Sequence, residues 1–220
     1  MPIIKTILHA NYGTAFSPPS PQDREPAIFG NANLAIPERS RGFEVGVEQP
    51  VSSTANVRAT SFQNDLTDTY QFDLATFALQ AIGKARTRGV ELEADWTPCE
   101  AIAFSAAYTY LDADDLGNGV RLLRRPRHTV SGSVSVRPHQ DVTVSLSALY
   151  VIDREDNDPL TFAQVDLEDY LTVRLAANWR VRPWLELFAR IENAFGEDYE
   201  DVAGYPALDT GAYAGFKVRF

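Results

Sequence analysis

The sequence predicts an all-β protein, an antiparallel up-and-down β-barrel of the kind that crosses a membrane with strands. Three patterns in the 220 residues indicate this fold: apolar and polar residues alternate strictly, long connections take turns with short ones, and aromatic residues gather near the ends of the alternating segments. A two-residue period puts alternate side chains on opposite faces of a strand. Short turns at one end and long loops at the other are typical of transmembrane barrels.

Ten segments show the alternation. Residues 90–96 are the clearest example, with Val90, Leu92, Ala94 and Trp96 on one face and Glu91, Glu93 and Asp95 on the other. The expected strands are 4–15, 41–50, 56–66, 84–97, 101–112, 122–137, 141–153, 169–182, 185–195 and 211–220. Long connections at 16–40, 67–83, 113–121, 154–168 and 196–210 alternate with short turns near 50–55, 98–100, 138–140 and 183–184. We therefore expect five hairpins, forming a curved wall whose first and last strands do not pair with each other.

A soluble β-sandwich would also alternate inward and outward residues. The apolar faces of the six clearest segments carry no charge, however, and several contain Ala and Gly, which lipid tolerates better than a sandwich core does. Aromatic residues near the segment ends match the two girdles of a membrane barrel. These features favour the membrane barrel.

Composition excludes several other classes of function. A formal net charge of −10 argues against a nucleic-acid partner, because binding phosphates needs a surplus of Lys and Arg. No apolar run reaches the roughly 18–20 residues of a membrane-spanning helix. The single Cys99 cannot form an internal disulfide, and no signal peptide opens the sequence, so we expect the chain to be a piece of a longer one.

We identify no catalytic set and no metal site. His9, His128 and His139 fall in different segments, and none stands at metal-ligand spacing with another ligand. The acidic runs 112–115 and 153–158 contain carboxylates that could attract Ca²⁺, but without the spacing of an EF-hand they are more typical of solvated loops. Two alternatives stay open: a standalone ten-stranded pore, and a ten-stranded hydrolase with His128 as its one candidate residue.

The last segment, GAYAGFKVRF, alternates and ends the given sequence on an aromatic residue. Phe216, Val218 and Phe220 share its apolar face. This pattern resembles the signal that the barrel-assembly machinery reads when it inserts outer-membrane barrels. We therefore expect these three residues to act in membrane assembly.

Several ordered blocks also resemble one protein family. They are LHANYGTAFSPP at 8–19, FQNDLTD at 62–68, GKARTRGVE at 83–91, LLRR at 122–125, and IENAFGEDYE at 191–200 with GYP at 204–206. On these blocks the chain resembles the TonB-dependent outer-membrane receptors, nearest the cobalamin (vitamin B12) receptors. The resemblance implies a barrel of about 22 strands with a plugged lumen. Residues 1–220 would then be a partial barrel domain holding the last ten strands, with the plug and the segment that contacts TonB in a preceding part.

The resemblance also implies a function and candidate site residues. It implies TonB-energised uptake of a metal-organic ligand such as cobalamin, no enzymatic step, no resident cofactor, and outer-membrane lipid as the surroundings. Arg124 corresponds to the ligand-contacting arginine of the LLRR block, and Arg125 follows it. The alternative is that both arginines pair with Asp112, Asp114 or Asp115 on the neighbouring strand end. The acidic run 153–159 replaces tyrosines of the cobalamin receptors, which keeps a siderophore open as the ligand.

Overall fold

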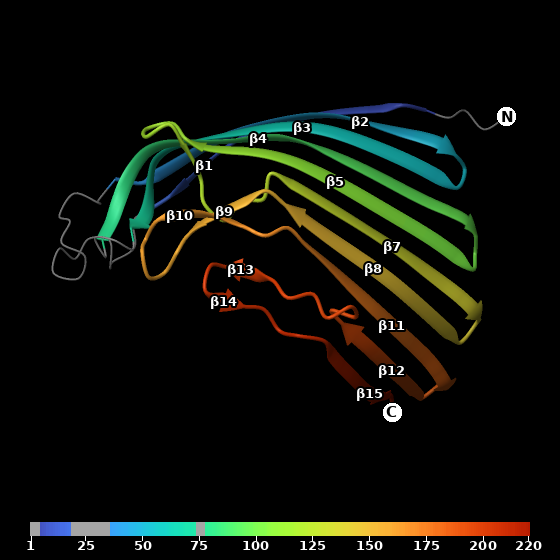
Figure 1. Ribbon diagram of the computed structural model, residues 1–220. Helices are drawn as coiled ribbons and strands as arrows, with labels where there is room; N and C mark the ends of the chain where they lie inside the picture. Colours follow the sequence, from blue (N-terminus) through green and yellow to red (C-terminus); the bar gives the residue numbers. More distant parts are fainter. Residues whose placement is uncertain (1–4, 19–35, 74–77) are drawn as a thin grey trace.

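The computed structural model describes residues 5–18, 36–73 and 78–220, and within them it is built of strands, turns and loops. Among these residues there is no helix with the length and apolar character needed to cross a membrane. Figure 1 shows one wide, curved sheet with two small hairpins past the strand ends that carry the long connections. The all-β antiparallel prediction is confirmed.

The large sheet follows chain order, and each neighbouring pair of strands is antiparallel. Its path is β1 (Ile7–Ser17), β2 (Glu38–Ser52), β3 (Ala55–Asp73), β4 (Ala78–Cys99), β5 (Ile102–Asp115), β7 (His128–His139), β8 (Val142–Ile152), β11 (Tyr170–Arg182), β12 (Leu185–Glu192) and β15 (Gly211–Val218), with β6 (Val120–Arg121) added to β5. Two hairpins stand apart, β9 (Arg154–Asn157) with β10 (Gln164–Leu167), and β13 (Glu200–Val202) with β14 (Tyr205–Pro206).

All ten predicted strands are present, and β3 and β4 run further than the alternation indicated. One predicted boundary is wrong: the strand expected at 122–137 begins only at His128, and residues 122–127 form a turn. Arg124 there adopts a φ of 58°, which β-strand pairing does not allow, and Pro126 supplies no backbone donor. Two of the predicted loops, 154–168 and 196–210, contain the extra hairpins. Parts of the predicted strand 4–15 and of the loops 16–40 and 67–83 lie outside the described residues.

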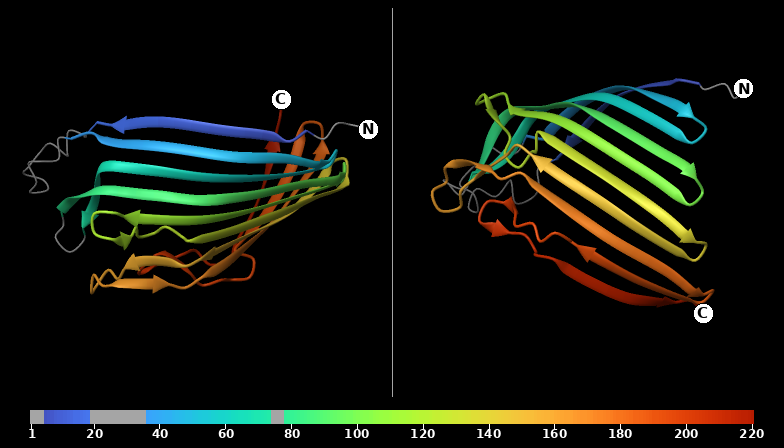
Figure 2. Two further views of the ribbon diagram at one scale, coloured as in Figure 1. Left: turned by 90° about the horizontal axis from the view of Figure 1, so that it is seen from above. Right: turned by 45° about the vertical axis from the view of Figure 1, so that its right-hand side comes forward.

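The sheet does not close on itself. Over the described residues, β1 is hydrogen-bonded to β2 and β15 to β12, and no ladder joins β1 to β15. Figure 2 shows the resulting open, curved wall, with the short turns gathered at one end and the long connections at the other. The prediction of an incomplete wall is confirmed. Its two outer strands expose backbone groups that another strand can pair with.

One face of the sheet is an apolar band. The register places Val47, Ala59, Leu92, Tyr108, Val130 and Tyr150 in one cross-strand row, and Trp96, Phe104, Val134, Leu146, Leu175 and Ile191 in another. The rings of Trp96 and Phe104 stack at 5.2 Å near the short turns. From Val142 to Ile152 the chain rises about 33 Å, which a strand tilt of about 40° reduces to about 25 Å, the height of a barrel's lipid-facing band.

The described part of the chain has almost no core of its own. Only six of its apolar residues are buried, five of them alanine or valine, whereas Leu8, Trp96, Trp179 and Phe216 are half or more exposed. A soluble sandwich would bury such side chains between two sheets. The single layer with an exposed apolar face fits a lipid environment instead.

Beyond the apolar band, towards the long connections, the same face becomes charged. On β4 the series Trp96, Ala94, Leu92 and Val90 continues with Arg88 and Arg86. Arg88 pairs with Asp112 at 2.7 Å, and Arg86 pairs with Asp65 at 2.6 Å. The strands therefore extend past the height that lipid can cover.

Candidate ligand-binding surfaces

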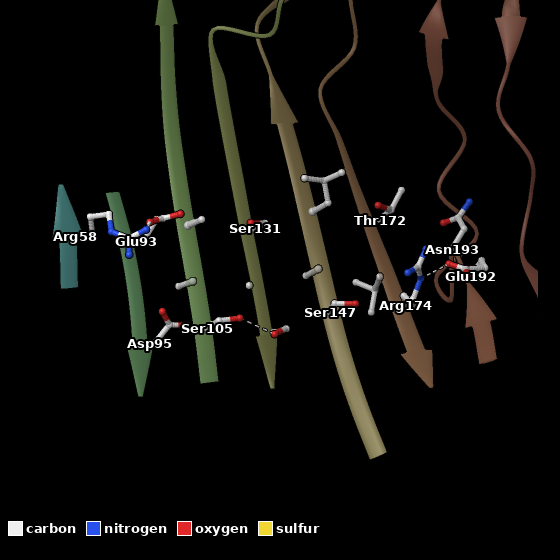
Figure 3. A pocket seen from close by; sticks show the side chains of 17 residues that line it. Arg58, Glu93, Asp95, Ser105, Ser131, Ser147, Thr172, Arg174, Glu192 and Asn193 are labelled. Atoms are coloured by element: carbon white, nitrogen blue, oxygen red, sulfur yellow. Dashed lines mark hydrogen bonds and ion pairs between the residues drawn. The ribbon is translucent and has the colours of Figure 1, made fainter. Parts of the chain in front are cut away.

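The opposite face of the sheet is polar and lines a hollow of about 620 Å³. The register aligns Asp95, Ser105, Ser133, Ser147 and Arg174 across five strands, with Glu192 beside Arg174 on a sixth. Figure 3 labels Asp95, Ser105, Ser147, Arg174 and Glu192 of this set along the hollow. The hydroxyls of Ser105 and Ser133 lie 2.7 Å apart, and small residues such as Ala107 and Ser131 fill the neighbouring row.

Most charges that flank this polar wall are already paired. Arg58 lies between Glu93, at 2.9 Å, and Glu48, at 3.3 Å. Arg174 donates from Nε to Glu192. Glu93, on the acidic face of β4, thus has a basic partner on the neighbouring strand β3. The centre of the wall offers hydroxyl groups and little charge, which suits contact with a polar body through hydrogen bonds.

A second polar site lies at the end of the sheet with the long connections. We call it the rim cluster: the turn 122–127, the β9–β10 hairpin, and the segment 197–206 that contains β13 and β14. Its centre is Asp156, whose side chain is fully buried. Asp156 accepts hydrogen bonds from Nε of Arg124 at 2.9 Å, from the Ala203 amide at 2.9 Å and from the Asn157 amide at 2.8 Å. One carboxylate thus ties together all three parts of the cluster.

The electrostatics of Asp156 follow from these contacts. Burial by itself raises the pKa of this carboxyl, but the hydrogen bonds from the Ala203 amide and the Arg124 guanidinium outweigh it, and the pKa lies below the ordinary aspartate value. The carboxylate is therefore charged at neutral pH. A buried charge is tolerated here because every contact that reaches it is a donor.

Arg154 is the second buried charge of the rim cluster, with only 4% of its surface exposed. Its guanidinium donates to the carbonyls of Glu200 and Glu168 and lies 4.6 Å from the centre of the Tyr170 ring. Tyr170 in turn stacks on Tyr199 at 4.0 Å. Because these contacts join the end of β10 and the start of β11 to the β13 segment, the two hairpins form one packed unit.

A third set of ion pairs holds the turn 122–127 to the start of β9. Arg121 donates to Asp153 at 2.8 Å and to Glu155 at 2.7 Å, and Arg127 pairs with Asp153 at 3.0 Å. The hydrogen bond from Arg121 lowers the pKa of Asp153. The acidic run that we expected to be a solvated loop is instead half of an ion-pair network.

Arg124 and Arg125, the two candidate ligand-binding residues, lie side by side in the turn 122–127, and both are exposed. Arg124 does form an ion pair, as the alternative interpretation expected, but its partner is Asp156 and not Asp112, Asp114 or Asp115. Its Nε makes that contact, while its side chain stays 46% exposed. Arg125 donates to the Arg124 carbonyl at 3.2 Å and makes no ion pair within the described residues.

Two of the three expected partners of the arginines contact other groups. Asp112 pairs with Arg88, and Asp115 accepts hydrogen bonds from Gly117 and Asn118 in its own turn. Sequence reasoning missed Arg154, Asp156 and Tyr170 as members of a buried cluster. The signal in the sequence was Arg154 itself, which lies among five acidic or amide residues in the run Asp153–Asp158. A single cation in such a run indicates that the segment forms ion pairs or hydrogen bonds of its own.

The remaining candidates lie as follows. His128 accepts or donates one hydrogen bond with Tyr108 at 2.9 Å, and within the described part of the chain no three His, Cys, Asp or Glu residues are placed to hold a metal ion. Phe216 and Val218 face the apolar side of β15, opposite Leu187 and Leu185 of β12. Phe220 follows the strand and is fully exposed. Their part in membrane assembly stays a prediction.

Comparison with known proteins agrees with this geometry. A family model described as the TonB dependent receptor-like β-barrel matches residues 5–194. Among solved structures, the pyoverdine receptor FpvA of Pseudomonas aeruginosa is 18% identical with a TM-score of 0.77, and covers 98% of this chain and 34% of its own. The ferric-catecholate import receptor Fiu of Escherichia coli K12 is 20% identical with a TM-score of 0.75, at 98% and 33% coverage.

The copper transporter OprC is 16% identical with a TM-score of 0.76, and the match covers all of this chain and 38% of the transporter. The chain thus spans about a third of the length of these solved structures. At such identities the likeness is one of fold. The similar proteins are named for siderophores and copper.

Proposed function

Because the chain belongs to the TonB dependent receptor-like β-barrel family of the bacterial outer membrane, we propose that it forms part of the wall of a receptor that takes up a metal-organic ligand. The preceding part of such a receptor would supply the plug and the contact with TonB. The chain would contribute lipid-facing strands, a polar inner wall and a preformed rim. No step of this function is enzymatic.

The observation that carries the proposal is the rim cluster with its two exposed arginines. Arg124 is held by Nε alone, so its terminal nitrogens are free to donate, and Arg125 has no carboxylate partner in the described structure. A guanidinium offers a planar fork that matches carboxylate, phosphate and catecholate oxygens. The packed hairpins behind it would fix that fork before the ligand arrives, which lowers the entropy lost on binding.

We propose a ferric siderophore as the ligand, and cobalamin as the second candidate. The siderophore is supported by the fold shared with the pyoverdine and ferric-catecholate receptors and by the acidic run in place of tyrosines at 153–159. Cobalamin is supported by the sequence blocks that resemble its receptors, LLRR at 122–125 among them. Both ligands carry anionic groups that an arginine pair can hold.

Ligand titration on cells that display the receptor tests the proposal. Arg125→Gln is the sharpest variant, because it removes a guanidinium that supports no ion pair of the rim. We expect it to weaken binding of the true ligand by about 1–3 kcal/mol, roughly 5- to 150-fold, with unchanged amounts of receptor at the surface. Arg182→Gln, at the short-turn end of β11, is the matched control for charge. Unchanged affinity for both a ferric siderophore set and cobalamin would remove Arg125 from the binding site.

A further inference from the structure

The charged part of the lipid-side face carries three cations without an ion-pair partner among the described residues. Arg39 and Arg41 lie two residues apart on β2, and Lys84 lies on β4, and all three are exposed. The register shows that they share one face: Thr67 of β3 lies between Arg39 and Lys84, and Asp65 lies beside Arg41. We call these residues the outer cation patch.

The outer cation patch differs from the neighbouring cations on the same face, because those cations form ion pairs with aspartates. Arg86 and Arg88 each have an aspartate within 2.7 Å. Asp65, the carboxylate next to Arg41, is already taken by Nε of Arg86 at 2.6 Å and by the Gln63 amide at 3.0 Å. In a chain with a net charge of −10, three neighbouring cations that form no ion pair among the described residues therefore make a local positive surface.

The position of the outer cation patch relative to the apolar rows indicates what kind of molecule binds there. Along β1 and β2 the lipid-side face reads Leu8 beside Val47, Ala10 beside Val45, and Tyr12 beside Phe43, and the next pairs are Thr14 beside Arg41 and Phe16 beside Arg39. The cations thus begin one residue pair beyond an aromatic pair that ends the apolar rows. Aromatic residues mark the level where a membrane's hydrocarbon gives way to headgroups.

A hollow of about 760 Å³ lies at the patch, lined by Phe16, Arg39, Arg41, Asp65 and Thr67 among others. Phe16 and Tyr12 are 72% and 65% exposed, so an apolar surface adjoins the cations. Two guanidinium groups at a hollow that Phe16 also lines suit the phosphate of an amphiphile, whose acyl chains would lie against the apolar rows of β1 and β2. A free anion would make no use of those apolar rows.

We propose that the outer cation patch binds the phosphorylated headgroup of a lipid in the outer leaflet, with the acyl chains against the apolar rows of β1 and β2. The lipid would occupy the outside of the wall. This site is separate from the metal-organic ligand of the receptor, and it depends on Arg39, Arg41 and Lys84 and not on the rim cluster.

Lipid retention by the purified full chain in uncharged detergent micelles tests this site. The probe is dioleoyl phosphatidic acid, which has a phosphate monoester headgroup, with dioleoyl phosphatidylcholine as the zwitterionic comparison. Native mass spectrometry counts bound lipids, and a fluorescence titration gives the affinity. The test variant is the triple change Arg39→Gln, Arg41→Gln and Lys84→Gln. The matched control, with the same change of net charge, is Arg137→Gln, Arg180→Gln and Arg182→Gln at the short-turn end.

We expect the patch variant to bind phosphatidic acid on the order of a hundredfold more weakly at low ionic strength, from the contribution of three cations near an anionic surface. The control triple should bind as the unchanged protein does, and added salt should reduce the difference. Equal loss in both triples, or no loss in either, would overturn the proposal. Displacement of the lipid by an equal concentration of inorganic phosphate would also overturn it, because that result would indicate a site for free anions. A changed oligomeric state in the patch variant would overturn it too, because that result would indicate an interface between copies of the chain.

Discussion

Asp156→Ala should loosen the rim cluster without disturbing the barrel wall. The change removes the acceptor shared by Arg124 and the Ala203 amide, whose bonds to Asp156 measure 2.9 Å each. Arg124 is 46% exposed and can turn to water, so losing it costs little. Ala203 is buried, and its amide is then left without a partner. A buried donor in that state costs about 1–3 kcal/mol, and we take the upper part of this range, about 2–3 kcal/mol, because the lost bond was charge-assisted.

Amide hydrogen exchange measures this loss directly. The reporter is the Ala207 amide, which donates to the Tyr199 carbonyl at 2.8 Å and makes no contact with Asp156. If local opening of the rim controls its exchange, Asp156→Ala should speed that exchange about 30- to 150-fold, the equivalent of 2–3 kcal/mol. Amides in the centre of β8 and β11 should keep their protection, because the wall's ladder is untouched.

Asp158→Ala is the matched control, two residues further along the same hairpin. Asp158 accepts bonds only from Leu160 and Thr161 of its own turn. Its loss should affect residues 160–163 and leave Ala207 protected. If Asp156→Ala left the Ala207 exchange rate unchanged, or if both variants raised it equally, the carboxylate would not be the residue that joins the two hairpins.

The pKa of Asp156 is lowered in the folded protein, so its stabilising effect is present above the ordinary aspartate value of 3.8 and is lost as the pH falls through the lower folded-state value. Protection of the Ala207 amide should therefore hold from pH 7 to about 5 and decline below about 4. In Asp156→Asn, which has no carboxyl group at this position, this decline should be absent. Leu146→Arg, in the middle of the apolar band, should lower the free energy of unfolding in lipid vesicles by about 2–4 kcal/mol, whereas Ser147→Arg on the opposite face should change it little; equal effects would show that neither face contacts lipid. Phe220→Ala should reduce the amount of barrel inserted into the outer membrane, measured by surface labelling, while the ligand affinity of the inserted fraction stays the same; normal insertion would exclude a role of this residue in assembly.

The fold could be predicted from the sequence because a strand's period is local. Alternation within one strand predicts the face on which each side chain lies, without information from any other strand. In β4, for example, Val90, Leu92 and Ala94 alternate with Glu91, Glu93 and Asp95. Ten such segments separated by short and long connections leave few arrangements other than a meander of hairpins. The strand boundary at 122–127 was wrong because a left-handed residue, Arg124, ends the pairing, and a non-glycine residue gives no local signal of that.

The partners within the loops were decided by tertiary structure alone. Asp156, Arg124 and Ala203 are separated by 32 and 47 positions in the chain, and no pattern with a short period connects them. The sequence placed Arg124 at the start of a strand beside acidic strand ends, yet which of several carboxylates would pair with it depended on how two hairpins pack. The alternation of the strands fixes the faces of the wall, since each strand's pattern is local; the ion pairs of the rim depend on side chains that meet only after the hairpins have folded against each other.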